Sequence, residues 1–311
     1  MRAVPALRIA VGPPGHRGER LAEQAVVAGG GTIVRPGGAT ADGLVWLDGA
    51  DPAGLRQALT AWPAVRWVQL PWAGVEAITG AFDHDRIWTC AKGSFAEPVA
   101  EHALTLALAG LRRLPERITA RTWGKPGGTS LFDADVTILG GGGIAVALLH
   151  VLAPFRVRGT VVRRRADPVP GAARTVATAD LDGALPGALV VFLALALTPE
   201  TAGIIGAAEL ARMDERAWLV NVARGRHVDT AALVDALRRR AIAGAALDVT
   251  EPEPLPDGHP LWTLPNAIVT PHTADWPEIV TGPLAARITA NVRHLAAGQP
   301  LEGVVDASAG Y

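Results

Sequence analysis

The chain has 311 residues, of which 49% are apolar and 19% charged, a composition typical of a folded globular protein rather than a disordered one. Its formal net charge of −1 argues against a dedicated nucleic-acid binder, because such proteins usually carry a strong basic excess. The length suggests about two domains. A single cysteine, Cys90, excludes a disulfide framework and a cysteine-based metal site within one chain, so we expect no metal and a reducing, cytoplasmic setting.

Short apolar runs alternate with helical patterns, which predicts βαβ units around parallel sheets. Strands are expected at 7–12, 43–47 and 65–70. A helix is predicted over 97–114, where Pro98 suits a first turn and the nearly all-round apolar surface indicates burial on most sides. The Gly/Pro/Thr-rich segment 122–130 is predicted to be a loop.

The βα pattern restarts after this loop. Two uncharged runs, 136–155 and 183–199, contain glycines, His150 or flanking prolines, so we interpret them as buried strands with adjoining turns or helices and expect no membrane association. A helix over 229–240 has Asp229 or Thr230 as a cap. Further strands are expected at about 159–163, 188–194, 217–222, 244–249 and 267–270, and a final amphipathic helix at 283–301.

A glycine-rich loop follows the first strand of this second half. The segment "ILGGGGIA" places Gly140, Gly142 and Ala145 in a G-x-G-x-x-A pattern between a strand and a helix. Gly140 permits a tight turn, Gly142 lets the backbone approach a pyrophosphate, and Ala145 allows close helix packing. A glycine-rich turn without a ligand is the alternative, but the strand–turn–helix context favours dinucleotide binding.

Three arginines stand where a dinucleotide-binding unit for NAD usually has an acid. About 20 residues after Gly142, the acid that would bind a ribose 2′-hydroxyl is replaced by Arg163, Arg164 and Arg165. Arginine at this point favours a 2′-phosphate, and therefore NADP(H) over NAD(H). A solvated strand end is the alternative interpretation.

Three later strands each lead into a residue capable of chemistry. "AWLVNVARG" leads to Arg224, "AGAALDVTEPEP" to Asp248 and Glu253, and "NAIVTPH" to His272. The carboxyl ends of strands in a doubly wound sheet line the ligand crevice, so these side chains are expected to converge there.

The run from Ala196 to Ala274 closely resembles the D-isomer-specific 2-hydroxyacid dehydrogenases, and "PVAEHAL" (98–104), "WAGVE" (72–76) and the glycine loop agree. The resemblance implies that the N-x-x-R-G arginine, the glutamate of the closing "EP" and the histidine of "TPH" are catalytic: Arg224, Glu253 and His272. It implies that Asp248 meets the nicotinamide carboxamide. Glu76 and Ala196 depart from the family pattern.

The resemblance also implies the binding residues. Backbone N–H groups of Ala73, Gly74 and Val75 would hold the substrate carboxylate, together with Arg224. The glycine loop and the arginine run predict cofactor contacts at Gly140, Gly142, Arg163, Arg164 and Arg165, and we expect further cofactor contacts at Gly143, Ile144, Val222, Ala223 and Asp248. Among the branches of the family, the glyoxylate/hydroxypyruvate reductases are the most similar.

Together these features predict two doubly wound α/β parallel-sheet domains. A Rossmann cofactor domain (98–275) would be inserted into a flavodoxin-like substrate domain (1–97 plus 276–311). The expected activity is hydride transfer between NADP(H) or NAD(H) and a small 2-keto or D-2-hydroxy acid. By resemblance we expect a homodimer, with no nucleic-acid partner. A dinucleotide-sensing regulatory protein on the same fold is the alternative.

Overall fold

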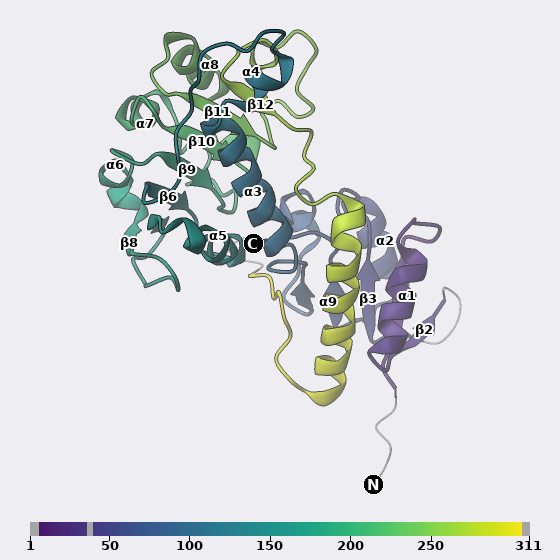
Figure 1. Cartoon of the computed structure of the whole chain (residues 1–311). Coiled ribbons are helices and arrows are strands. Elements are labelled where there is room, and N and C mark those ends of the chain that lie inside the picture. Colours follow the sequence, from purple (N-terminus) through teal and green to yellow (C-terminus); the bar gives the residue numbers. More distant parts are fainter. Residues whose placement is uncertain (1–5, 36–39, 307–311) are drawn as a thin grey trace. The chain divides into compact units, whose positions relative to one another are not determined.

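A computed structural model of the chain describes residues 6–35 and 40–306 (Figure 1). The described residues divide into two compact units. Unit 1 contains the chain up to Phe95 together with the segment from Pro277 onward, and unit 2 contains Ala96–Trp276. Among the helices of this described part, none is both long and apolar enough to cross a membrane.

Unit 1 is built on a five-stranded parallel sheet in the order β2-β1-β3-β4-β5, the flavodoxin-like order. Its strands are β1 (Arg8–Gly12), β2 (Thr32–Val34), β3 (Gly43–Trp46), β4 (Trp67–Gln69) and β5 (Ile87–Thr89). Its helices are α1 (Glu19–Ala28), α2 (Pro52–Ala61), the short 3-10 helix η1 (Glu76–Ala81) and the C-terminal α9 (Pro277–Ala297).

Both faces of this sheet are buried because successive side chains along a strand point to opposite faces. Ile9 and Val11 of β1 pack in the core shared with α1 and α9, whereas Ala10, between them, packs in the core shared with α2 and η1. Figure 1 shows α1 and α9 side by side. Ile288 and Val292 of α9 are fully buried, so the C-terminal helix completes a core begun by the first strand.

Unit 2 is built on a seven-stranded parallel sheet in the order β12-β11-β10-β9-β6-β7-β8. Numbered from its own first strand and read from β8, this order is 3-2-1-4-5-6-7, the Rossmann order with one added strand. Its strands are β6 (Asp135–Leu139), β7 (Arg158–Arg163), β8 (Arg174–Ala177), β9 (Val190–Leu193), β10 (Trp218–Asn221), β11 (Gly244–Leu247) and β12 (Ala267–Val269).

The helices of unit 2 cover both faces of its sheet. They are α3 (Ala96–Leu111), α4 (Leu114–Thr119), α5 (Gly143–Leu152), α6 (Leu181–Ala184), α7 (Ala207–Arg212) and α8 (Thr230–Arg239), with short 3-10 helices η2 (Ala153–Phe155), η3 (Thr178–Asp180), η4 (Gly225–His227) and η5 (Pro260–Trp262). α6, α7 and α8 contribute to one core, and α3 packs on β10, β11 and α5. Because β10, β11 and β12 are adjacent and parallel, the loops that follow them emerge at one edge of the sheet.

The predicted fold class is confirmed: both sheets are parallel, and helices pack on both of their faces. The expected strands all form, and Asp229 caps α8 by accepting a hydrogen bond from the N–H of Ala232 (3.0 Å). The single helix expected over 97–114 is wrong at its end, because α3 stops at Leu111 and Arg113 adopts a left-handed conformation (φ 55°) before α4 begins. The last helix begins at Pro277 rather than 283, with Pro283 inside it.

Candidate active site

Arg224 is held by a loop that leaves the carboxyl end of β10. The side chain of Asn221, 1% exposed, accepts a hydrogen bond from the N–H of Ala223 (3.0 Å) and donates one to the carbonyl of Arg224 (2.9 Å). Gly225 follows because a Cβ there would lie 1.9 Å from the carbonyl oxygen of Thr250. Each residue of the N-x-x-R-G pattern therefore has a structural reason. Asn221 holds the loop by hydrogen bonds, Arg224 is the side chain that the loop carries, and Gly225 allows the backbone to pass close to that of Thr250.

Glu253 lies in the turn that follows β11. Its Oε2 accepts a hydrogen bond from the N–H of Thr250 (3.3 Å), and the Thr250 hydroxyl donates to the carbonyl of Pro252 (2.8 Å). These bonds within the turn leave Oε1 of Glu253 directed at the neighbouring histidine.

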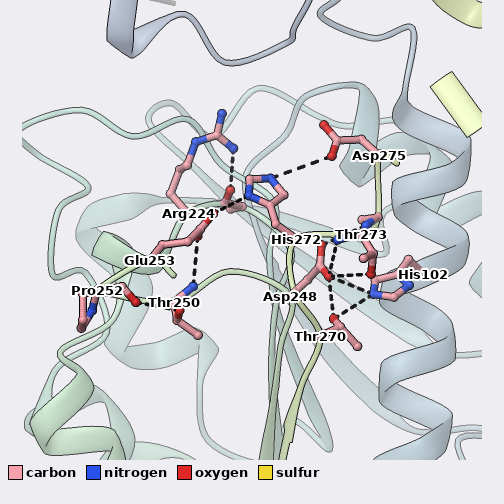
Figure 2. A network of polar contacts seen from close by, with 12 residues as sticks. His102, Arg224, Asp248, Thr250, Pro252, Glu253, Thr270, His272, Thr273 and Asp275 are labelled. Atoms are coloured by element: carbon pink, nitrogen blue, oxygen red, sulfur yellow. Dashed lines mark hydrogen bonds and ion pairs between the residues drawn. The ribbon is translucent and has the colours of Figure 1, made fainter. Parts of the chain in front are cut away.

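His272 lies in the loop that follows β12 and has a left-handed backbone (φ 52°), which is uncommon outside glycine. Its N–H donates to the carbonyls of Asp248 (2.8 Å) and Thr270 (3.0 Å), so hydrogen bonds compensate for the unfavourable conformation. The ring Nδ1 lies 2.6 Å from Oε1 of Glu253, and Nε2 lies 3.9 Å from Oδ1 of Asp275. Figure 2 shows the His272 ring between these carboxylates, with Arg224 beside it.

This pairing fixes the ionisation of both partners. The hydrogen bond that His272 donates to Glu253 is the largest cause that raises the pKa of His272; burial lowers this pKa, and the nearby Asp275 raises it further. The same bond lowers the pKa of Glu253. The site therefore favours an imidazolium whose Nδ1–H is committed to Glu253 and whose Nε2–H is available for transfer.

Asp248 accepts hydrogen bonds from residues on both sides of His272 and so holds the loop that carries it. Burial opposes its ionisation, but hydrogen bonds from His102 and Thr270 and from the N–H groups of Thr273 and Ala274 keep the pKa of its carboxyl well below the usual range. The Thr270 hydroxyl lies 2.5 Å from Oδ1, Thr273 N 2.9 Å from Oδ1, and Ala274 N 3.0 Å from Oδ2.

The helix α3 contributes the remaining contact of this network (Figure 2). His102 Nε2 lies 3.2 Å from Oδ1 of Asp248 and 3.2 Å from the Thr270 hydroxyl. The Asp248 side chain is 1% exposed, and both its oxygens accept hydrogen bonds from the chain. Contact between Asp248 and a nicotinamide carboxamide stays a prediction.

The glycine loop has the shape that a bound pyrophosphate requires. Gly140 has φ +111°, and a Cβ there would lie 2.1 Å from the carbonyl oxygen of Ala194. A Cβ on Gly142 would meet nothing within 4 Å, so open space lies beside the backbone that begins α5. Gly143 and Ile144 form the first turn of α5, and Ala145 is fully buried. The loop fits a dinucleotide phosphate at a helix N-terminus.

The three arginines lie at the end of β7 beside this loop. The side chain of Arg163 packs against Gly141, where a Cβ would be 3.0 Å from its Cδ. Arg165 is paired with Asp167 (3.1 Å). A hydrogen bond from Thr198 lowers the pKa of Glu200, and the charge of Arg164 lowers it further, which places Arg164 near the loop after β9.

The substrate loop predicted from the sequence belongs to unit 1. Ala73 and Gly74 follow β4 with partial or full exposure, and Val75 is buried in the core. Val222 and Ala223, predicted to touch the cofactor, are buried and belong to the loop of unit 2 that carries Arg224. Sequence reasoning did not predict the contact of His102 with Asp248 or that of Asp275 with His272. Neither residue stands at a spacing, or is of a type, that distinguishes it from other residues of the sequence.

Comparison with known proteins identifies the family. Residues 102–274, more than half of the chain, match the family model for the D-isomer specific 2-hydroxyacid dehydrogenase, NAD binding domain. The chain belongs to the D-isomer-specific 2-hydroxyacid dehydrogenases. This confirms the resemblance seen in the sequence, and with it an NAD(P)-dependent hydroxyacid dehydrogenase function on a Rossmann-type cofactor domain.

Several known proteins are similar to this chain over more than half of its length. A glyoxylate/hydroxypyruvate reductase A from Serratia proteamaculans is 33% identical over 70% of this chain and 69% of its own. A glyoxylate reductase from Thermofilum pendens is 38% identical over 58% of this chain and 57% of its own. A crystal structure of a family member from Xanthobacter autotrophicus Py2, in complex with NADPH and MES, has a TM-score of 0.84 at 29% identity, covering 98% of this chain and all of that one.

Proposed function

We propose that this dehydrogenase is an NADP(H)-preferring reductase of small 2-keto acids of the glyoxylate or hydroxypyruvate kind, forming D-2-hydroxy acids. The observation that carries this proposal is the 2.6 Å pair between Glu253 and Nδ1 of His272, with Arg224 beside it. An imidazolium and a guanidinium at one edge of a sheet suit a substrate that has a carboxylate and accepts a proton.

Each residue of the site has its own role in the proposed reduction. When bound, a reduced nicotinamide would supply the hydride that reduces C2 of the keto acid. His272 donates its Nε2 proton to the keto oxygen, so the carbonyl becomes a hydroxyl, while Glu253 holds the ring and stabilises the charge on it before transfer. Arg224 binds the substrate carboxylate and polarises the carbonyl. The backbone N–H groups of Ala73, Gly74 and Val75 are proposed as further ligands of that carboxylate.

The preference for NADP(H) is supported by the surroundings of the glycine loop. Arg163 lies against Gly141, Arg164 lies near Glu200, and β7 ends in arginines rather than in the acid that would bind a ribose 2′-hydroxyl. A 2′-phosphate bound here would form charge-assisted hydrogen bonds with the guanidinium groups. The Xanthobacter relative was solved with NADPH.

A steady-state assay tests the proposal. The expected result is oxidation of NADPH, faster than that of NADH, with at least one of glyoxylate, hydroxypyruvate and related 2-keto acids. Replacing His272 with alanine should abolish turnover and largely spare NADPH binding measured by fluorescence titration. Full activity of that variant would overturn the assignment, and cofactor binding without turnover across the panel would favour a dinucleotide-sensing regulatory protein.

The protein is also proposed to form a homodimer through unit 2. The side chains of Trp123, Ile118 and Phe132 are 98%, 75% and 50% exposed, although all three are large and apolar. Large apolar side chains left exposed on α4 and on the segment after it are typical of a surface covered by another chain. Light scattering on a size-exclusion column should give the mass of two chains, and a monomer mass would contradict this.

A further inference from the structure

A second carboxylate faces the reacting edge of His272. Nδ1 of the ring is occupied by Glu253, so Nε2 is the nitrogen left to donate to a substrate. Oδ1 of Asp275 lies 3.9 Å from that same Nε2. A keto oxygen accepting a hydrogen bond from Nε2 would stand about 3 Å from it. Together the two distances place Oδ1 of Asp275 at most about 7 Å from that keto oxygen.

The backbone fixes Asp275 in this place. It follows Ala274, whose N–H is bonded to Oδ2 of Asp248 (3.0 Å), and the side chain of Asp275 is only 33% exposed. The Asp275 carboxylate is thus attached to the same hydrogen-bonded loop that carries His272, and its approach to Nε2 is a property of that loop.

The two sides of the His272 ring differ in charge. Figure 2 shows the guanidinium of Arg224 on one side of the ring and the carboxylate of Asp275 on the other. Both charges are close enough to act on His272, Asp275 raising its pKa and Arg224 lowering it. A keto acid that places its carboxylate on Arg224 and its keto oxygen at Nε2 directs C3 away from Arg224, because C1 and C3 diverge from C2. The substituent on C3 then faces Asp275.

We propose that Asp275 determines substrate specificity by selecting 2-keto acids with a hydrogen-bond donor on C3, such as a hydroxyl, over those with a second carboxylate. A carboxylate side chain only accepts hydrogen bonds, so it binds a hydroxyl donor and repels a like charge. This inference rests on the proposed function, since it assumes that a keto oxygen is placed at His272. It narrows the substrate class to 2-keto acids that have one carboxylate and a hydroxyl on C3, such as hydroxypyruvate.

The test compares wild type with Asp275→Asn and Asp275→Ala on two substrates that differ at C3. kcat/KM is measured with hydroxypyruvate, which has a C3 hydroxyl, and with oxaloacetate, which has a C3 carboxylate. Wild type should prefer hydroxypyruvate. The ratio of kcat/KM for hydroxypyruvate to kcat/KM for oxaloacetate should fall by about tenfold or more in both variants, because the second carboxylate of oxaloacetate is no longer repelled by Asp275. Asp257→Asn, which removes one negative charge from an exposed turn of unit 2, is the matched control and should leave the ratio unchanged.

Binding gives a readout that does not need turnover. Calorimetric titration of D-glycerate and D-malate into the NADP⁺ complex should show the same change in the ratio of Kd values. If wild type reduces no keto acid, the proposed function fails, while the Kd ratio still decides the role of Asp275. If the ratios are the same in wild type and variants, or all substrates weaken by one common factor, Asp275 only supports the imidazolium and the proposal is overturned.

Discussion

The pairing of His272 with Glu253 makes the pH dependence of the reaction predictable. Glu253 raises the pKa of His272, and the reduction needs the protonated ring, so kcat/KM should be constant below that pKa and fall as pH rises through it. Glu253→Gln removes the carboxylate that stabilises the protonated ring of His272. The falling limb should then move to lower pH, with about a tenfold loss of kcat/KM at neutral pH.

Glu251 provides the control for this experiment. It lies in the same turn and is exposed, and its carbonyl, not its carboxylate, accepts the hydrogen bond from Thr230. Glu251→Gln should keep the wild-type pH profile. A profile that moves equally in both variants would mean that general charge, and not the bond at 2.6 Å, sets the pKa of His272.

The arginines at the end of β7 offer a second test on single side chains. Replacing Arg163, Arg164 and Arg165 with glutamine should raise the KM for NADPH at least tenfold and change the KM for NADH little, because each charge-assisted bond to a phosphate contributes about 1.5–3 kcal/mol. The same triple replacement at Arg238, Arg239 and Arg240, at the end of α8, is the control. Equal effects on both cofactors would leave the β7 arginines as a solvated strand end.

Two glycines of one turn should respond differently to a methyl group. Gly140→Ala places a Cβ 2.1 Å from a backbone oxygen at φ +111°, so it should destabilise the fold by about 2 kcal/mol or more. Gly142→Ala points into open space, so its melting temperature should stay near wild type while NADPH binding weakens. Thermal unfolding and fluorescence titration separate the two effects. Undiminished NADPH binding by Gly142→Ala would place the phosphate elsewhere.

The helix α3 takes part in the site through His102. Asp248 can only accept hydrogen bonds, so Nε2 of His102 is the donor, and its loss leaves the support of the His272 loop incomplete. His102→Leu should lower kcat about tenfold with a small change in the KM for NADPH, and His102→Gln, which retains a donor, should recover part of it. If glutamine and leucine behave alike, His102 serves packing alone.

The apolar runs were sufficient to predict most strands and the loops that end them, including those carrying Arg224, Glu253 and His272. Strands β2, β5 and β8 were missed because each contains only two consecutive apolar residues, bounded by polar ones. The break after Leu111 depends on one left-handed residue, Arg113, to which no sequence rule points. Contacts such as His102 with Asp248 and Asp275 with His272 arise from the packing of α3 and from the path of one loop, which spacing in the sequence does not encode.

The two units have separate cores. The core of unit 1 is formed by the segment before unit 2 together with the segment after it. Its α9 contributes Ile288 and Val292, and Arg287, 9% exposed, donates to the carbonyl of Cys90 (2.9 Å). A chain ending at Trp276 should therefore keep unit 2 folded and bind NADPH, while the segment before Phe95 becomes sensitive to proteases. Mass spectrometry of the fragments measures this. Protection of that segment equal to wild type would show that α9 is dispensable.

The position of α9 in the sequence also determines the order in which the two units can complete their folding during synthesis. Strands β1 to β5 are synthesised before unit 2, yet the helix that covers one face of their sheet is synthesised only after unit 2. Unit 2, whose strands and helices are contiguous from Ala96 to Trp276, can finish folding while the earlier segment still exposes Ile9, Val11 and Trp67. The first-made sheet is therefore the last to be completed. During synthesis it is the part of the chain that a chaperone would have to shield.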